Sequence, residues 1–139
     1  MRLKVQLVIC ADDGGTDKIH DIAVLEKDCR RIEQLGVTLA EAKQLLTQLQ
    51  RHVVAHQASM FVTMRSHCGA CGTPLQRKAQ ATRVLRTLFG TVRLSSPRLY
   101  HCRCQTHPTI TFRPLSELLT ESTTPELLFL ETKWASLIS

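Results

Sequence analysis

Negative charge is missing from a long stretch of this 139-residue sequence: residues 42–116 contain no aspartate and no glutamate. Enzymes that cut nucleic acid with two divalent metal ions hold those ions with carboxylates, so this stretch cannot form such a centre by itself. The phosphate-binding loop motif, the serine nucleophile elbow and the HExxH zinc motif are absent from the whole sequence. We therefore expect no enzymatic activity from this chain.

Long apolar runs are missing as well. No stretch approaches the roughly 20 consecutive apolar residues that a membrane-spanning helix needs, so we expect no membrane partner. The chain starts with basic residues, but its apolar residues alternate with polar ones, and Asp12 and Asp13 stand where a signal peptide has small residues. We expect a cytoplasmic protein, in which six cysteines are more often metal ligands or buried thiols than disulfides.

Aromatic residues are scarce, at 4% of the sequence, although 43% of the residues are hydrophobic. The length suits one domain or one and a half small ones, and a core can form. Small cores often need a metal ion or a partner for stability, because a short chain buries only a modest fraction of its surface.

Positive charge is concentrated where carboxylates are missing. Residues 42–116 contain nine arginines and two lysines, whereas the segments before and after them have net charges of −2 and −3. An ordinary surface mixes both signs. Arginine suits contacts to phosphates and base edges, so we expect binding to DNA; the alternative is that these arginines pair with the acidic flanks. The candidate DNA-contact residues lie in or beside the cysteine-rich part: Arg77, Lys78, Arg83, Arg86, Arg93, Arg98 and Arg103.

The first half of the chain predicts a β-hairpin and one long helix. Residues 2–9 alternate apolar and polar side chains, a turn follows, and residues 19–26 form the returning strand. Thr38 is a good N-cap, and Glu41 completes a capping box, so a helix is expected over residues 38–64. Its apolar spacing also suits a seam with a second helix, so this helix either packs on its own domain or forms a dimer.

The second half predicts strands and a C-terminal helix. Alternating residues within 80–104 indicate strands around a turn at Phe89-Gly90, with a break at residues 95–97 and a further strand over 99–104. The sequence Thr124-Pro125-Glu126 is a helix start. The helix that follows, over residues 125–138, is too apolar for a free tail, so we expect it to pack on a second copy or on another protein part.

The cysteines predict a metal centre. Cys68 and Cys71 form a CxxC pair followed by Gly72, which is a zinc-knuckle pattern. Cys102 and Cys104 are two residues apart, and in a strand their side chains would point to the same face. Our first choice is a structural Zn²⁺ bound by these four cysteines, and four protein ligands leave no open position for catalysis.

Other readings of the cysteines stay open. His107 is the alternate fourth ligand in place of Cys102, and His67 and His101 are weaker candidates. The four cysteines could also be unligated thiols, or one CxxC could be a redox pair, although a redox pair usually sits in a thioredoxin-like βαβ context that is not predicted here.

With these residues in view, the chain resembles the N-terminal region of the Kra-type insertion-sequence transposases, a bacterial group with an RNase H-like catalytic domain. The resemblance covers nearly the whole chain and rests on MRLKVQLVICADDG, LGVTLAEAKQLLTQLQ, CGACGTPL and TLFGTVRLSSPRLYHCRC. It implies that the zinc-bearing part helps to recognise transposon ends. It also implies that catalysis belongs to a downstream domain that is missing here, so the chain resembles a truncated or split transposase product.

Together these observations predict an α+β protein with a hairpin and long helix over residues 1–64, a zinc-ribbon-like DNA-binding module over 65–113, and a helical lead-in to the catalytic domain over 114–139. The expected function is recognition of double-stranded DNA at transposon ends. The alternative is an assembly module, in which residues 38–64 and 125–138 bind a second copy or the catalytic part and the zinc ribbon is purely structural.

Overall fold

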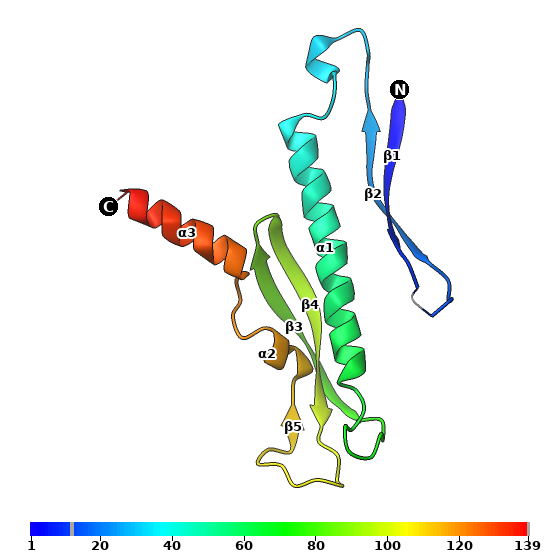
Figure 1. Ribbon diagram of the computed structural model, residues 1–139, viewed down its shortest axis with the longest axis vertical. Coiled ribbons are helices and arrows are strands. Elements are labelled where there is room, and N and C mark those ends of the chain that lie inside the picture. The colour runs from blue at the N-terminus through cyan, green and yellow to red at the C-terminus, as the bar shows by residue number, and fades with distance from the viewer. Residues whose placement is uncertain (12, 139) are drawn as a thin grey trace. The chain divides into compact units, whose positions relative to one another are not determined.

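The computed structural model describes residues 1–11 and 13–138 and has the α+β class expected from the sequence (Figure 1). Its elements follow in the order β1 (Arg2–Ile9), β2 (Lys18–Glu26), a 3-10 turn (Ile32–Gln34), α1 (Leu39–Met64), β3 (Arg77–Thr87), β4 (Gly90–Tyr100), β5 (Thr111–Phe112), α2 (Pro114–Leu118) and α3 (Pro125–Ile138). The chain divides into two compact units, Met1–Val53 and Val54–Ser139, so that α1 contributes to both.

The first unit contains the predicted hairpin. β1 and β2 pair antiparallel from Arg2↔Glu26 to Ile9↔Lys18, with one irregularity in register after Val5. Ile22 and Leu25 of β2 are the buried apolar residues of this hairpin. They are three positions apart, so regular alternation does not place both on one face, and Ile22 lies at the irregularity in register. In β1 the half-buried residues Val5, Leu7 and Ile9 do follow the predicted alternation. The loop between the strands includes Asp12, which lies outside the described residues.

The predicted capping box starts α1. The backbone N–H of Thr38 donates to the Glu41 carboxylate at 2.8 Å, and the backbone N–H of Glu41 donates to the Thr38 hydroxyl at 3.3 Å. The ammonium group of Lys27, whose side chain is only 7% exposed, pairs with the same carboxylate. The Lys27 hydrogen bond, followed by those from Thr38, lowers the pKa of Glu41 to about 2.

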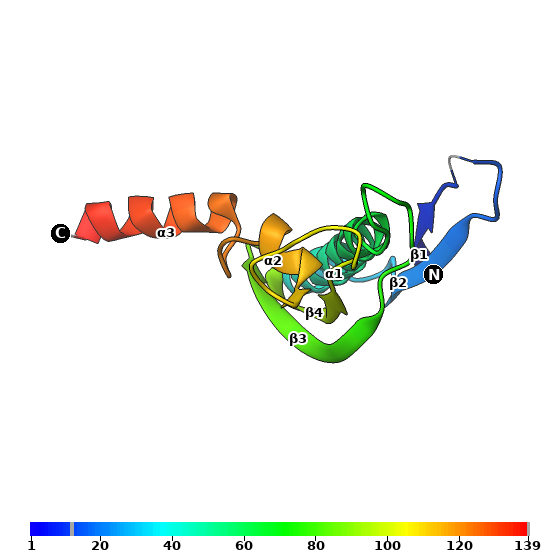
Figure 2. The same ribbon diagram turned by 90° about the horizontal axis from the view of Figure 1, so that it is seen from below.

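The second unit is built around a three-stranded antiparallel sheet with the order β3-β4-β5. Alternate residues of β3 and β4, among them Leu85, Val92 and Leu94, are buried in one core cluster with Ala58 of α1. Leu115 of α2 is 0% exposed in the same cluster. The C-terminal half of α1 and the short helix α2 therefore cover the apolar face of the sheet (Figure 2).

Two sequence-based expectations for the strands are wrong. β4 continues through residues 95–97 without a break. Because β5 pairs only with Leu99 and Tyr100, β4 has a free edge at Pro97, where a missing N–H is tolerated. The strand expected over 99–104 ends at Tyr100, and the chain then turns, with the Gln105 N–H donating to the Cys102 carbonyl at 3.4 Å.

The predicted C-terminal helix is present as α3 (Pro125–Ile138) and extends away from the sheet of its unit (Figures 1 and 2). Just before it, the chain runs beside β3: the Arg86 N–H donates to the Ser122 carbonyl, and the Thr124 N–H donates to the Arg86 carbonyl. Within the second unit, large apolar side chains of α3 remain exposed, including Phe129 and Trp134. None of the helices in the described residues is long and apolar enough to cross a membrane.

Candidate metal centre

The first cysteine pair lies in a tight turn that follows α1. The Gly72 N–H donates to the Cys68 carbonyl at 2.8 Å, and the Cys68 N–H donates to the Thr73 carbonyl at 2.9 Å. Gly72 has a φ of 71°, a left-handed conformation that suits glycine because it has no Cβ. The knuckle predicted from CxxC and the following glycine is therefore present.

The second cysteine pair lies in a turn and not in the strand that the sequence predicted. Cys102 and Cys104 lie in the turn after β4 rather than in a strand, so strand alternation is not what aligns their sulfurs. The pairing of β4 with β5, and the donation of the His101 N–H to the Ile110 carbonyl at 3.0 Å, hold the base of this turn. A hairpin thus brings two turns together from distant parts of the sequence.

The four sulfurs form one cluster. The Sγ atoms of Cys68 and Cys104 are 3.5 Å apart, those of Cys71 and Cys102 are also 3.5 Å apart, and all four lie within 4.8 Å of one another. Four thiolates around a tetrahedral zinc ion, with Zn–S bonds of about 2.3 Å, would have neighbouring sulfurs about 3.8 Å apart. The cluster therefore has the size of a tetrahedral metal site, and four cysteines are close enough to bind one ion.

The protonation of the thiols also suits a cation. Hydrogen bonds from the backbone of Cys71 and Ala70 lower the pKa of Cys68, and the hydroxyl and backbone of Thr73 lower the pKa of Cys71 to about 6. In contrast, the neighbouring sulfurs, that of Cys102 first, raise the pKa of Cys104. Several thiolates in one place repel each other, and a bound cation would remove that repulsion because metal ligands must be deprotonated.

The histidines that were considered as ligands lie outside the cysteine cluster. The ring of His107 stacks on that of His101, with centroids 3.9 Å apart. His101 in turn stacks on Phe112, and desolvation lowers the pKa of His101. His67, although adjacent to Cys68, contacts the hydroxyl of Ser66.

The candidate DNA-contact residues fall into two groups. Arg83 donates to the Ser116 hydroxyl at 3.2 Å and to the Leu119 carbonyl, and Arg86 pairs with Glu131 of α3 at 2.5 Å. Lys78 lies 5.6 Å from the centre of the Tyr100 ring. The remaining candidates are exposed and have no ion pair within residues 1–11 and 13–138: Arg77, Arg93, Arg98 and Arg103.

An ion pair lies beside the cysteines, between Arg65 just after α1 and Glu117 of α2, with a nitrogen–oxygen distance of 2.7 Å. The sequence left open that arginines pair with the acidic flanks, but it did not identify these two partners. The two residues are 52 positions apart, so no local pattern joins them. The opposite net charges of their segments were the one signal that favoured such a contact.

In comparisons with known proteins, no family model, curated protein or solved structure matches this chain.

Proposed function

We propose that this chain is a metal-stabilised DNA-binding module that recognises transposon ends, as the N-terminal part of a bacterial transposase whose catalysis belongs to another domain. The proposed metal is a structural Zn²⁺ bound by Cys68, Cys71, Cys102 and Cys104. Four thiolate ligands suit zinc and leave no open coordination position for a substrate. The metal would thus hold the sheet and its turns in place, and the arginines would contact DNA.

The observation that carries this proposal is the set of arginines without a carboxylate partner. Arg77 and Arg93 both line a groove between α1 and β4, beside the hydroxyl-bearing residues Ser59 and Thr63. Guanidinium and hydroxyl groups are typical contacts to the DNA backbone, where they fix position rather than read sequence. The carboxylate-free composition of residues 42–116 keeps competing negative charge out of this part of the sequence.

A salt titration tests the proposal. We expect the logarithm of affinity for a duplex to fall linearly with the logarithm of salt concentration, because each phosphate contact releases counterions. Replacing Arg77 and Arg93 together by Ala should lower the slope by about two, at about 0.9 per contact, and should weaken binding to all sequences alike.

The matched control is the double variant Arg30→Ala, Arg31→Ala, which removes the same charge from the first unit, outside the carboxylate-free stretch. It should keep most of the slope. Binding that hardly depends on salt, or equal losses in the two double variants, would contradict the proposal.

A second candidate function is assembly. It is favoured by the ion pairs Arg86–Glu131 and Arg65–Glu117, which engage two of the arginines, and by the exposed apolar side chains of α3. In this reading residues 38–64 and 125–138 bind a second copy or a catalytic part. Light scattering at several protein concentrations separates the two candidates, since a dimer without salt-dependent DNA binding would favour assembly.

A further inference from the structure

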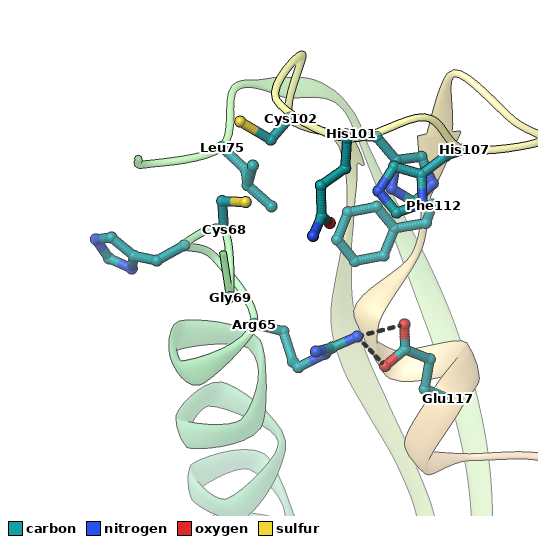
Figure 3. Close-up of a pocket in the computed structure, with 11 residues that line it drawn as sticks. Arg65, Cys68, Gly69, Leu75, His101, Cys102, His107, Phe112 and Glu117 are labelled. Carbon is teal, nitrogen blue, oxygen red and sulfur yellow. Dashed lines mark hydrogen bonds and ion pairs between the residues drawn. The ribbon is translucent and has the colours of Figure 1, made fainter. Parts of the chain in front are cut away.

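A pocket opens beside the cysteine cluster in the second unit (Figure 3). Its volume is about 120 Å³, well below the roughly 300–1,000 Å³ of pockets for drug-sized ligands, so it suits one planar ring system rather than a larger ligand. Leu75 stands on one side and Phe112 on the other, and Arg65 and Glu117 lie below them (Figure 3). The pocket thus combines two apolar walls with a charged floor.

Stacked rings fix the position of Phe112. His101 lies against Phe112 with ring centroids 4.6 Å apart and planes inclined by 24°, and His107 covers the other side of His101 at 3.9 Å and 18°. This column of three rings holds the Phe112 side chain at the wall of the pocket. A planar aromatic ligand could therefore stack beside it without the protein first having to order that side chain.

The floor keeps free hydrogen-bonding groups. One nitrogen of Arg65 contacts both carboxylate oxygens of Glu117, at 2.7 and 2.9 Å. A guanidinium has five N–H donors and a carboxylate about four acceptor positions, so this contact leaves donors and acceptors available. Both side chains are close to half exposed, at 48% and 43%, and a ligand can reach them.

The floor has the polarity of one nucleobase edge. Guanine presents a carbonyl oxygen next to a ring N–H and an amino group; the oxygen suits Arg65, and the two adjacent donors suit the carboxylate of Glu117. Adenine, cytosine and thymine do not offer two adjacent donors beside an acceptor. Proteins commonly read such edges on unpaired bases that stack on aromatic side chains.

We propose that this pocket binds an unpaired guanine of a nucleic-acid strand, stacked against Phe112 with its edge on Arg65 and Glu117. The proposal rests on the proposed nucleic-acid binding and deepens it, because it assigns the recognition of one base to Arg65 and Glu117, which were not among the candidate DNA-contact residues.

The experiment uses a DNA duplex with a single-stranded overhang of about six thymidines, in which one thymidine is replaced by guanine, adenine or cytosine. Fluorescence anisotropy with the full chain should show about tenfold tighter binding for the guanine overhang than for the other three. Glu117→Gln should remove this preference, because the amide replaces one of the two accepting oxygens with an N–H donor that faces the donors of guanine.

Glu121→Gln is the matched control, since it removes an exposed carboxylate a few residues away that does not line the pocket. This variant should keep the guanine preference. Phe112→Leu keeps an apolar wall but loses the ring, and it should also reduce the preference. Metal content and circular dichroism equal to wild type show that the variants are folded.

The outcomes separate the two proposals. Equal affinity of the wild type for all four overhangs, with duplex binding intact, would overturn the guanine pocket and leave the proposed function standing. A guanine preference that survives Glu117→Gln would also overturn it. If neither the duplex nor any overhang binds, both proposals fail.

Discussion

At the scale of single residues, the first unit contains a contact that depends on protonation. The rings of His20 in β2 and His52 in α1 lie 4.6 Å apart. Desolvation, followed by the nearby charges of His20 and Arg51, lowers the pKa of His52. The neutral form of His52 is therefore favoured in this position, because a positive charge on its ring is partly desolvated and lies near other basic groups.

The lowered pKa of His52 determines whether the stability of the fold rises or falls with pH. Between the folded and unfolded pKa values the unfolded chain binds more protons, so stability rises with pH in that range. We expect the His52 contact to be fully stabilising above about pH 6.5 and to weaken as pH falls through the lower pKa of the folded state. Melting temperatures at about pH 5 and about pH 7.5 check this.

His52→Gln should reduce the difference between the two melting temperatures, because its side chain cannot be protonated. His67→Gln, which removes a histidine outside the first unit, is the control and should leave that difference nearly unchanged. A wild-type protein more stable at the lower pH would contradict this argument.

At the scale of elements, the capping box at the start of α1 is expected to contribute measurably to stability. Removing the Thr38 hydroxyl should destabilise the chain by about 1 kcal/mol, because the backbone N–H of Glu41 loses its partner. Urea unfolding of Thr38→Ala measures this change in the free energy of unfolding. Thr47→Ala, at a position inside the same helix where the hydroxyl bonds to the Lys43 carbonyl, should cost clearly less.

Signals of this kind explain which parts of the fold could be predicted. The capping box located the start of α1, Thr124 and Pro125 located that of α3, and alternation of apolar residues located the two hairpins. The cysteine spacing identified the four residues of the cluster.

Other parts depend on contacts between distant residues and could not be read from the sequence. Leu115 is buried because the sheet and α1 surround it, although no periodic pattern marks α2. The sequence after Tyr100 predicts that the strand continues. The chain instead turns at Cys102, because the pairing between β4 and β5 ends at Tyr100. The Arg65–Glu117 contact, and with it the pocket, joins two segments that are far apart in the chain.

At the scale of the whole molecule, the metal centre is the expected source of stability for the second unit. Its buried core is small, and a structural zinc ion supplies on the order of 10 kcal/mol of folding free energy. We expect one zinc per chain after purification without added metal, measured by elemental analysis. Less than about a third of a zinc per chain would contradict the proposed ion.

Removal of the metal is expected to affect the second unit and not the first. Chelation should loosen residues 65–107, which hydrogen exchange would detect, while β1 and β2 of the first unit should keep their protection. Cys71→Ser should lower zinc content in the same way. Cys10→Ser, which changes an exposed cysteine outside the cluster, should leave zinc content unchanged.

The pairing of residues 122–124 with Arg86 has a further consequence, for self-association. β3 is the outer strand of its sheet, and an unpaired strand edge is a template on which another chain can add a strand. The segment before α3 occupies this edge at Arg86, and the positive charges of Arg77 and Lys78 lie near the other end of the same strand. Because this pairing and these charges disfavour the addition of another strand at β3, we expect a variant that breaks the Arg86 pairing to aggregate sooner than one altered on the exposed face of β4.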